Sequence, residues 1–217
     1  MNARESSGTA ARALGAIGLA GVAVFALVCG AAQVMRADLD WIAAPLSYYL
    51  TGAYGDGVIA AYLGLSVGLA AIGLGFRRAL HGRARSAAPL LLFLVAAIAL
   101  ALTALSEKAK LHDASGAWAL VHLLAAQTTF LCVTVAMLLQ SWRVRYDMSW
   151  RPRSTPMLAL AVLAFAALWL HVLARGLPRG ASQKIVIVLI LAWLAWASYR
   201  LWHAPRERRT PSFPPPR

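Results

Sequence analysis

The sequence predicts an all-α membrane protein, a bundle of six transmembrane helices with both termini in the cytoplasm. Of its 217 residues, 60% are hydrophobic and only 13% are charged, whereas a soluble domain carries about 25% charged residues. The charges gather in short segments between long apolar runs, which is typical of polytopic membrane proteins. The Lys and Arg residues also divide unequally between the two sides, and this asymmetry gives the orientation.

Six apolar segments are long enough to cross a membrane. Each has about 17–25 residues, and a helix that rises 1.5 Å per residue needs about 20 to cross a hydrocarbon core of about 30 Å. Each segment must be helical, because backbone polar groups find no water partner in lipid. Within a transmembrane domain of residues 13–202, the segments span residues 13–35, 58–76, 89–105, 118–142, 157–173 and 185–201.

The two ends of the chain lie outside this domain. Arg4 and Arg12 precede the first apolar segment, as basic residues precede a secretory signal. The segment is longer than the core of a signal peptide, about 7–15 residues, so we expect a retained helix after a cytoplasmic segment, residues 1–12. The tail, residues 203–217, is rich in Pro and Arg. Such a composition cannot bury apolar surface, so we expect a disordered cytoplasmic tail.

The basic residues set both the orientation and the expected partners. Of 21 Lys and Arg residues, 15 fall in the N-terminal segment, in the loops 77–85 and 143–153 and from Arg200 onward, and 6 fall in the other loops. The excess belongs in the cytoplasm, so we expect a multi-pass protein of the inner (cytoplasmic) membrane with both termini inside. A net charge of +13 could suggest nucleic acid, but basic residues that flank apolar segments meet lipid headgroups. We therefore expect membrane lipid, and no nucleic acid, as a partner.

The second apolar segment carries a small-xxx-small pair. Gly64 and Gly68 lie on one face of that helix, and two small residues at this spacing let another helix approach closely. The spacing predicts helix packing within the chain, with a homo-oligomer through the same face as the alternative. No protein partner can be named from the sequence.

An outer loop between the first two helices combines glycines with tyrosines. Glycines permit tight turns, and tyrosines supply an apolar body with a polar tip. This composition favours an interfacial cap over the bundle, with a loop that grips a ligand as the alternative. The loop residues that could contact a ligand are Ser47, Tyr48, Tyr49, Tyr54 and Asp56.

Ionisable residues gather toward the outer side of the membrane, where they could form a polar pocket. His122 lies roughly 7–8 Å below the outer end of its helix, at 1.5 Å per residue, and His171 comes to a similar depth on the next helix. An ionisable residue inside a membrane is a hypothesis for a functional site. Three more charged or titratable residues are expected in the loop before His122, and Arg175 shares a face with His171. The predicted cluster comprises Glu107, His112, Asp113, His122, His171 and Arg175.

These residues favour a non-enzymatic protein that binds lipid or a partner in an outward-facing polar pocket. The chain has no recognised cofactor motif or metal-ligand spacing, so we expect no cofactor. One alternative is a membrane enzyme. It would be a metal-dependent lipid hydrolase that uses His112, Asp113, His122 and His171, or a haem redox protein with His122 and His171 as ligands. Another alternative is a small transporter, although the apolar segments contain no carboxylate.

Three stretches carry a resemblance to a known family. They are the outer loop from Leu46 to Gly55, His122 at the start of its helix, and the sequence from Gly176 through Gln183 and Lys184 to Leu201. In these stretches the chain resembles the bacterial integral membrane family known as domain of unknown function number 998. The resemblance covers residues 15–202 and implies six membrane helices. It implies no activity, because none is established for the family.

Overall fold

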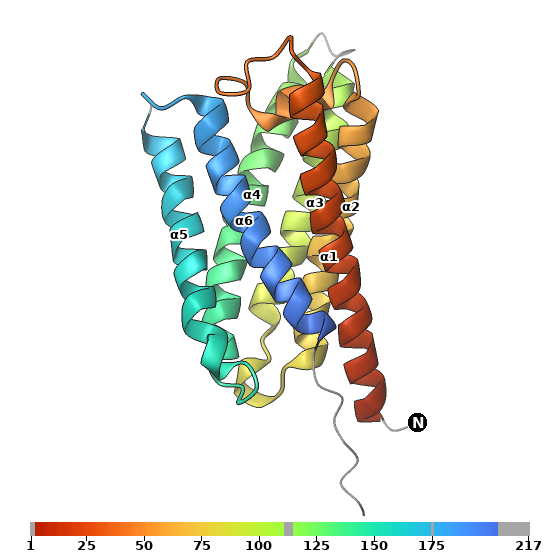
Figure 1. Cartoon of the computed structure of the whole chain (residues 1–217), viewed down its shortest axis with the longest axis vertical. Coiled ribbons are helices and arrows are strands. Elements are labelled where there is room, and N and C mark those ends of the chain that lie inside the picture. The colour runs from red at the N-terminus through yellow and green to blue at the C-terminus, as the bar shows by residue number, and fades with distance from the viewer. Residues whose placement is uncertain (1–2, 111–114, 175, 204–217) are drawn as a thin grey trace, which may run out of the picture.

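The structure is a computed structural model that describes residues 3–110, 115–174 and 176–203. These residues form a bundle of helices (Figure 1). Six of the helices are long and apolar enough to cross a membrane, as the sequence predicts, so the chain is a multi-pass membrane protein. They are α1 (Ala3–Met35), α2 (Gly55–Ala79), α3 (Ala87–Lys110), α4 (Ala117–Val144), α5 (Ser154–Leu173) and α6 (Arg179–Trp202). The short 3-10 helices between them are η1 (Leu46–Leu50), η2 (Gly82–Ala84) and η3 (Arg151–Arg153).

Each helix contains the apolar segment predicted for it and continues beyond it. One difference that bears on the site lies in α3, which was expected to end at residue 105 and continues to Lys110. Glu107, expected in a loop, therefore lies in the last turns of a helix, and that expectation was wrong. Its carboxylate pairs with Lys110 at i+3, a spacing that places both side chains on one helix face. The predicted tail lies outside the described residues apart from His203.

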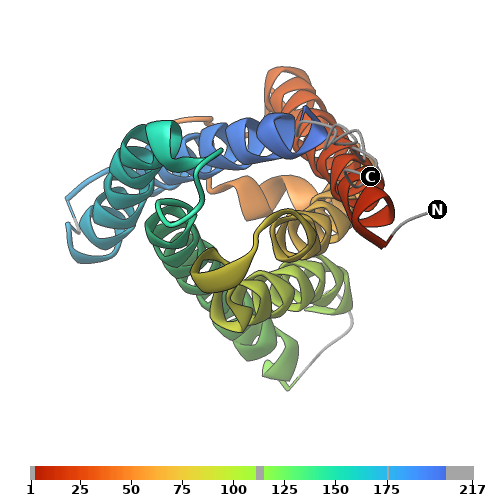
Figure 2. The ribbon, with the colours of Figure 1, turned by 90° about the horizontal axis from the view of Figure 1, so that it is seen from below.

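The six helices form a closed ring. Each helix packs against the next along the chain, and α6 packs back against α1, as the view along the bundle shows (Figure 2). α2 also contacts α6 across the interior. The start of α1 and the end of α6 lie at the same end of the bundle, which we call the terminal end. The opposite end carries the α1–α2 loop and is called the loop end.

Glycines bring α1 and α2 into backbone contact. A Cβ added to Gly21 would lie 2.8 Å from the carbonyl oxygen of Gly64, and one added to Gly68 would lie 3.5 Å from that of Gly18. Close approach of this kind replaces the hydrophobic driving force, which is absent between helices in lipid. The face with Gly64 and Gly68 is thus occupied by α1 of the same chain. Oligomerisation through that face stays a prediction.

Trp193 lies at the centre of the packing between the middle of the bundle and the terminal end. Its side chain is fully buried, and its indole Nε1 donates to Ser141 Oγ and to the carbonyl of Met157, both at 3.1 Å. The Phe93 ring stacks on it with centroids 6.1 Å apart, and Phe76 lies at 6.2 Å. A buried indole N–H needs a hydrogen-bond acceptor, and here the acceptors lie on α4 and α5. Trp193 thereby joins α6 to four other helices.

The loop end is held together by contacts between the α1–α2 loop and the first turn of α6. The first N–H groups of a helix have no partner within it. In α6, Gly180 N–H donates to the carbonyl of Ala43 at 3.1 Å, and Ala181 N–H donates to that of Ile42 at 2.8 Å. A Cβ added to Gly180 would overlap the carbonyl oxygen of Ala44. Only glycine therefore lets the loop lie this close to α6.

We expect Gly180→Ala to destabilise the protein by about 1–3 kcal/mol, the usual cost of overpacking, because the added methyl group meets backbone that cannot move aside. Thermal unfolding in detergent measures this loss. Gly30→Ala is the matched control, since a Cβ added to this helical glycine meets nothing within 4 Å. An equal melting temperature for Gly180→Ala and the wild type would contradict the role of this contact.

Candidate functional site

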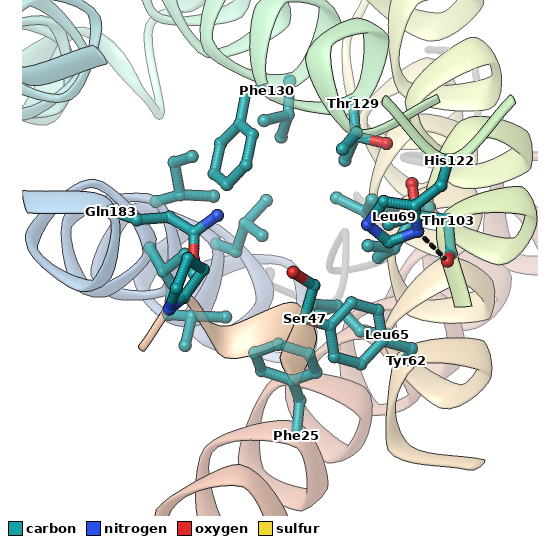
Figure 3. A pocket seen from close by; sticks show the side chains of 18 of the residues that line it. Phe25, Ser47, Tyr62, Leu65, Leu69, Thr103, His122, Thr129, Phe130 and Gln183 are labelled. Atoms are coloured by element: carbon teal, nitrogen blue, oxygen red, sulfur yellow. Dashed lines mark hydrogen bonds between the residues drawn. The ribbon is translucent and has the colours of Figure 1, made fainter. Parts of the chain in front are cut away.

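The loop-end half of the bundle encloses a cavity of about 280 Å³. Its walls come from α1, α2, α3, α4 and α6, and residues of the α1–α2 loop border its loop end (Figure 3). Thirteen of the nineteen lining residues are apolar, so the cavity suits a mainly apolar occupant. The polar lining residues are Ser47, Tyr62, Thr103, His122, Thr129 and Gln183.

Polarity within the cavity changes along the bundle axis. Ser47 lies in η1 and Gln183 in the second turn of α6, while His122 lies in the second turn of α4. These three residues border the loop end of the cavity. The lining residues farthest from the loop end are apolar, among them Leu69, Val133 and Leu194. Thr129, near the middle of α4, is polar, but its hydroxyl donates to the carbonyl of Ala125 within the same helix. The cavity therefore has a polar end and an apolar body.

The imidazole of His122 is held by acceptors on α3. Its Nδ1 lies 2.9 Å from the carbonyl oxygen of Thr103 and 3.0 Å from Oε2 of Glu107. Ser106 Oγ, which donates its own hydrogen to Thr103, lies 3.4 Å away. A nitrogen that faces acceptors must carry a hydrogen, so Nδ1 is the protonated nitrogen. The other nitrogen, Nε2, points toward the cavity (Figure 3).

Glu107 is a buried carboxylate with two cationic or titratable partners. Only 9% of the residue is exposed, and both its carboxylate oxygens lie 3.0 Å from Lys110 Nζ. A charge is costly to bury unless a partner compensates it. Lys110 supplies that compensation, and His122 adds a second contact. Because α3 continues past residue 105 and includes Glu107, a membrane helix of this protein does carry a carboxylate.

His171, another residue of the predicted cluster, lies away from the cavity. His171 Nδ1 lies 2.7 Å from Ser182 Oγ on α6, and this serine donates its hydrogen to the carbonyl of Pro178, so the histidine donates to the serine. His171 does not line the cavity. The two histidines thus have separate partners on different helices. The other three members of the cluster, His112, Asp113 and Arg175, fall outside the described residues.

The residues predicted in the outer loop divide into three groups. Ser47 lines the cavity. Tyr48 and Tyr54 are more than half exposed, and Asp56 pairs at the surface with Lys108 at 2.6 Å. Tyr49 is fully buried, with Lys184 Nζ 5.5 Å from its ring centre, and burial raises the pKa of its hydroxyl.

Arg36 fastens the outer loop to the end of α1. Its guanidinium donates to both carboxylate oxygens of Asp38 at 2.7 Å and to the carbonyl of Thr51 at 2.6 Å. The hydrogen bonds from Arg36 hold the pKa of Asp38 below its usual value. Gly52, beside the guanidinium, has a φ of +74°, a backbone conformation that glycine adopts without strain. The loop therefore follows a defined path over the cavity.

A comparison with known families identifies the family of the chain. The family described as "Protein of unknown function (DUF998)" matches residues 19–200. The chain belongs to the DUF998 family. The resemblance drawn from the sequence is thereby confirmed. No curated protein and no solved structure matches the chain.

The cavity of this DUF998 protein contains polar residues that were not predicted from the sequence as site residues. Gln183 was noted only for its place in the family resemblance, and Tyr62 and Thr103 were not singled out. Each is a polar residue on a helix that is otherwise apolar where it faces the cavity, and that pattern could have drawn attention to them. Within residues 3–110, 115–174 and 176–203, no group of three or more His, Cys, Asp or Glu side chains could hold a metal ion.

The contacts of His122 in the DUF998 chain predict its tautomer. At a pH at which the imidazole is neutral, we expect the hydrogen on Nδ1 and a bare Nε2, because only Nδ1 faces acceptors. Nitrogen NMR of protein labelled with ¹⁵N-histidine measures this directly, and the His122→Gln variant assigns the signal. A hydrogen on Nε2 would contradict the described geometry. His171 is expected to show the same tautomer, since its Nδ1 faces Ser182.

Proposed function

We propose that this protein binds one small lipophilic molecule within the membrane and catalyses no reaction on it. The observation that carries the proposal is the cavity with a polar end at Ser47, His122 and Gln183 and an apolar body that extends toward the middle of the membrane. An amphiphile in a membrane has the same order, with its head near the headgroups and its chain toward the bilayer centre. The ligand would therefore bind with its head at the loop end.

The size of the cavity limits the ligand. About 280 Å³ lies near the lower end of the range of about 300–1,000 Å³ for small-molecule sites. A cavity of this size suits a single chain or a small ring system and is too small for a phospholipid with two chains. We therefore take the ligand to be a single-chain amphiphile or a compact lipophile.

The cavity also borders the lipid-facing surface. Leu123 lines the cavity, yet 51% of this residue is exposed. It follows His122 on α4, near the loop end of the cavity. A lipophile could enter beside this side chain directly from the membrane, without passing through water.

The enzyme alternatives receive less support from the described residues. They need His122 and His171 at one metal ion or one haem. In the structure His122 contacts α3 and His171 contacts α6, and only the former lines the cavity. The separate partners favour binding over redox or hydrolytic chemistry at a shared centre.

Filling the cavity tests the proposed function. Ala126 lines the cavity, so Ala126→Phe should place a ring in the space of the ligand and weaken binding at least about tenfold, which corresponds to about 1.4 kcal/mol. Ala60→Phe is the matched control, because Ala60 is exposed on α2 and does not line the cavity. Native mass spectrometry of protein released from detergent micelles measures the bound single-chain lipophile.

The wild type and Ala60→Phe should retain a lipophile of one mass class, and Ala126→Phe should lose it. A lipophile retained equally by all three proteins would place the ligand outside this cavity. Thermal unfolding of each variant shows whether it is folded.

We further propose that the chain lies in the cytoplasmic membrane with the terminal end in the cytoplasm. The support comes from charge. Among the described residues, the loops at the terminal end hold the arginines between α2 and α3 and between α4 and α5, whereas acidic residues such as Asp38, Asp56 and Glu107 lie at the loop end. Basic residues are retained on the cytoplasmic side.

Labelling of single cysteines tests this orientation. In a background with Cys29→Ala and Cys132→Ala, we expect Tyr48→Cys to react with a membrane-impermeant maleimide added to intact cells. Met148→Cys should react only after the membrane is permeabilised. Both positions are exposed, at 56% and 86%, so accessibility within the protein does not limit either reaction. The reverse pattern would show the opposite orientation.

A further inference from the structure

The polar groups at the loop end of the cavity present both donors and an acceptor. Gln183 Oε1 accepts a hydrogen bond from the N–H of Leu46 at 2.8 Å. This fixes the amide, and its NH₂ group faces the cavity (Figure 3). Ser47 lies on the same side of the cavity and can donate its hydroxyl hydrogen. Two donors thus lie across the cavity from His122.

His122 presents the only titratable nitrogen among the described lining residues. Nδ1 is fixed as a donor by Thr103 and Glu107, so Nε2 of the neutral ring can accept a hydrogen or take up a proton. The charged groups that face this ring are Glu107 and Lys110 on α3, which compensate each other. Tyr62 on α2 is the remaining titratable group of the lining. The site is therefore neutral when it is empty and His122 is neutral.

We propose that the ligand is a single-chain carboxylic acid, bound as a carboxylate against a protonated His122. This inference rests on the proposed function. When the acid form enters, its O–H bond breaks and an Nε2–H bond forms, so the proton stays within the site. The imidazolium then donates to one carboxylate oxygen, while Gln183 and Ser47 donate to the oxygens from the other side. The occupied site remains neutral overall, as burial in an apolar cavity requires.

Glu107 favours an acid over other head groups. A carboxylate beside Nδ1 stabilises the charged form of the imidazole, and an alcohol head, which binds a neutral histidine, gains nothing from it. An ammonium head would meet donors from Gln183 and would compete with a proton on His122. A carboxylate is the head group that uses the donors, the imidazolium and Glu107 together.

Calorimetric titration of the full-length protein in nanodiscs tests the proposal, with dodecanoic acid compared with 1-dodecanol. The titration is run at pH 8, where dodecanoic acid in solution is a carboxylate, and the proposed pair of carboxylate and imidazolium contains one proton more than this carboxylate and a neutral ring. Binding of the acid should therefore take up about one proton from the buffer, and its enthalpy should depend on the ionisation enthalpy of the buffer. Binding of 1-dodecanol should show no such dependence.

Two histidine variants locate the proton. His122→Gln keeps a polar side chain that cannot titrate. This variant should abolish the proton uptake. It should also lower the affinity for dodecanoic acid about 10- to 100-fold, the range expected for a lost charged hydrogen bond. His171→Gln is the matched control and should change neither quantity, because His171 lies outside the cavity lining. If His122→Gln does not fold, the comparison of dodecanoic acid with 1-dodecanol on the wild-type protein still tests the proposal.

The outcomes separate this proposal from the proposed function. Equal affinity for the acid and the alcohol, with no proton uptake, would overturn the carboxylic acid assignment while the lipophile site stands. Proton uptake that persists in folded His122→Gln would also overturn it. If neither dodecanoic acid nor 1-dodecanol binds the wild-type protein, the proposed function itself is contradicted.

Discussion

The docking of the α1–α2 loop on the first turn of α6 holds the loop end of the bundle together. The carbonyls of Ile42 and Ala43 accept hydrogen bonds from the first N–H groups of α6, and Gln183 holds the N–H of Leu46. Helix starts in lipid need such partners, because water is absent. The same contacts link the loop after α1 to α6 at this end, while α1 and α6 pack directly nearer the terminal end. They also place Ser47 at the cavity. A structural requirement of α6 thus also builds the polar end of the site.

The second constraint is electrostatic. Glu107 and His122 could be buried together only because Lys110 compensates the carboxylate and Thr103 accepts from the imidazole. A buried ion pair adds little to stability compared with an apolar pair of the same shape. Its presence beside a mainly apolar cavity is therefore not explained by stability alone, and the proposed ligand would give it a role.

The sequence was sufficient for the six helices and the family, because the bilayer imposes a length and a composition that can be read from single segments. It was insufficient for the site. The apolar periodicity ends near residue 105, and nothing local shows that the more polar residues after it, Glu107 among them, continue α3 to Lys110. Nor does the spacing of His122 and His171 reveal that each bonds to a different helix. Gln183 required the tertiary contact with Leu46, which lies 137 residues away. Membrane-spanning segments can be recognised from the local sequence, whereas a binding site depends on how distant segments pack together.

The partial exposure of Leu123 has a consequence for how affinity should be measured. A ligand that enters the cavity from the bilayer is first concentrated there by partitioning, which gains about 0.8 kcal/mol, or about fourfold, for each methylene. An affinity referred to the aqueous concentration would therefore rise with chain length even for methylenes that touch nothing in the cavity. Referred to the mole fraction in the membrane, the affinity should level off once the chain fills about 280 Å³. The chain length at which it levels off measures the depth of the site.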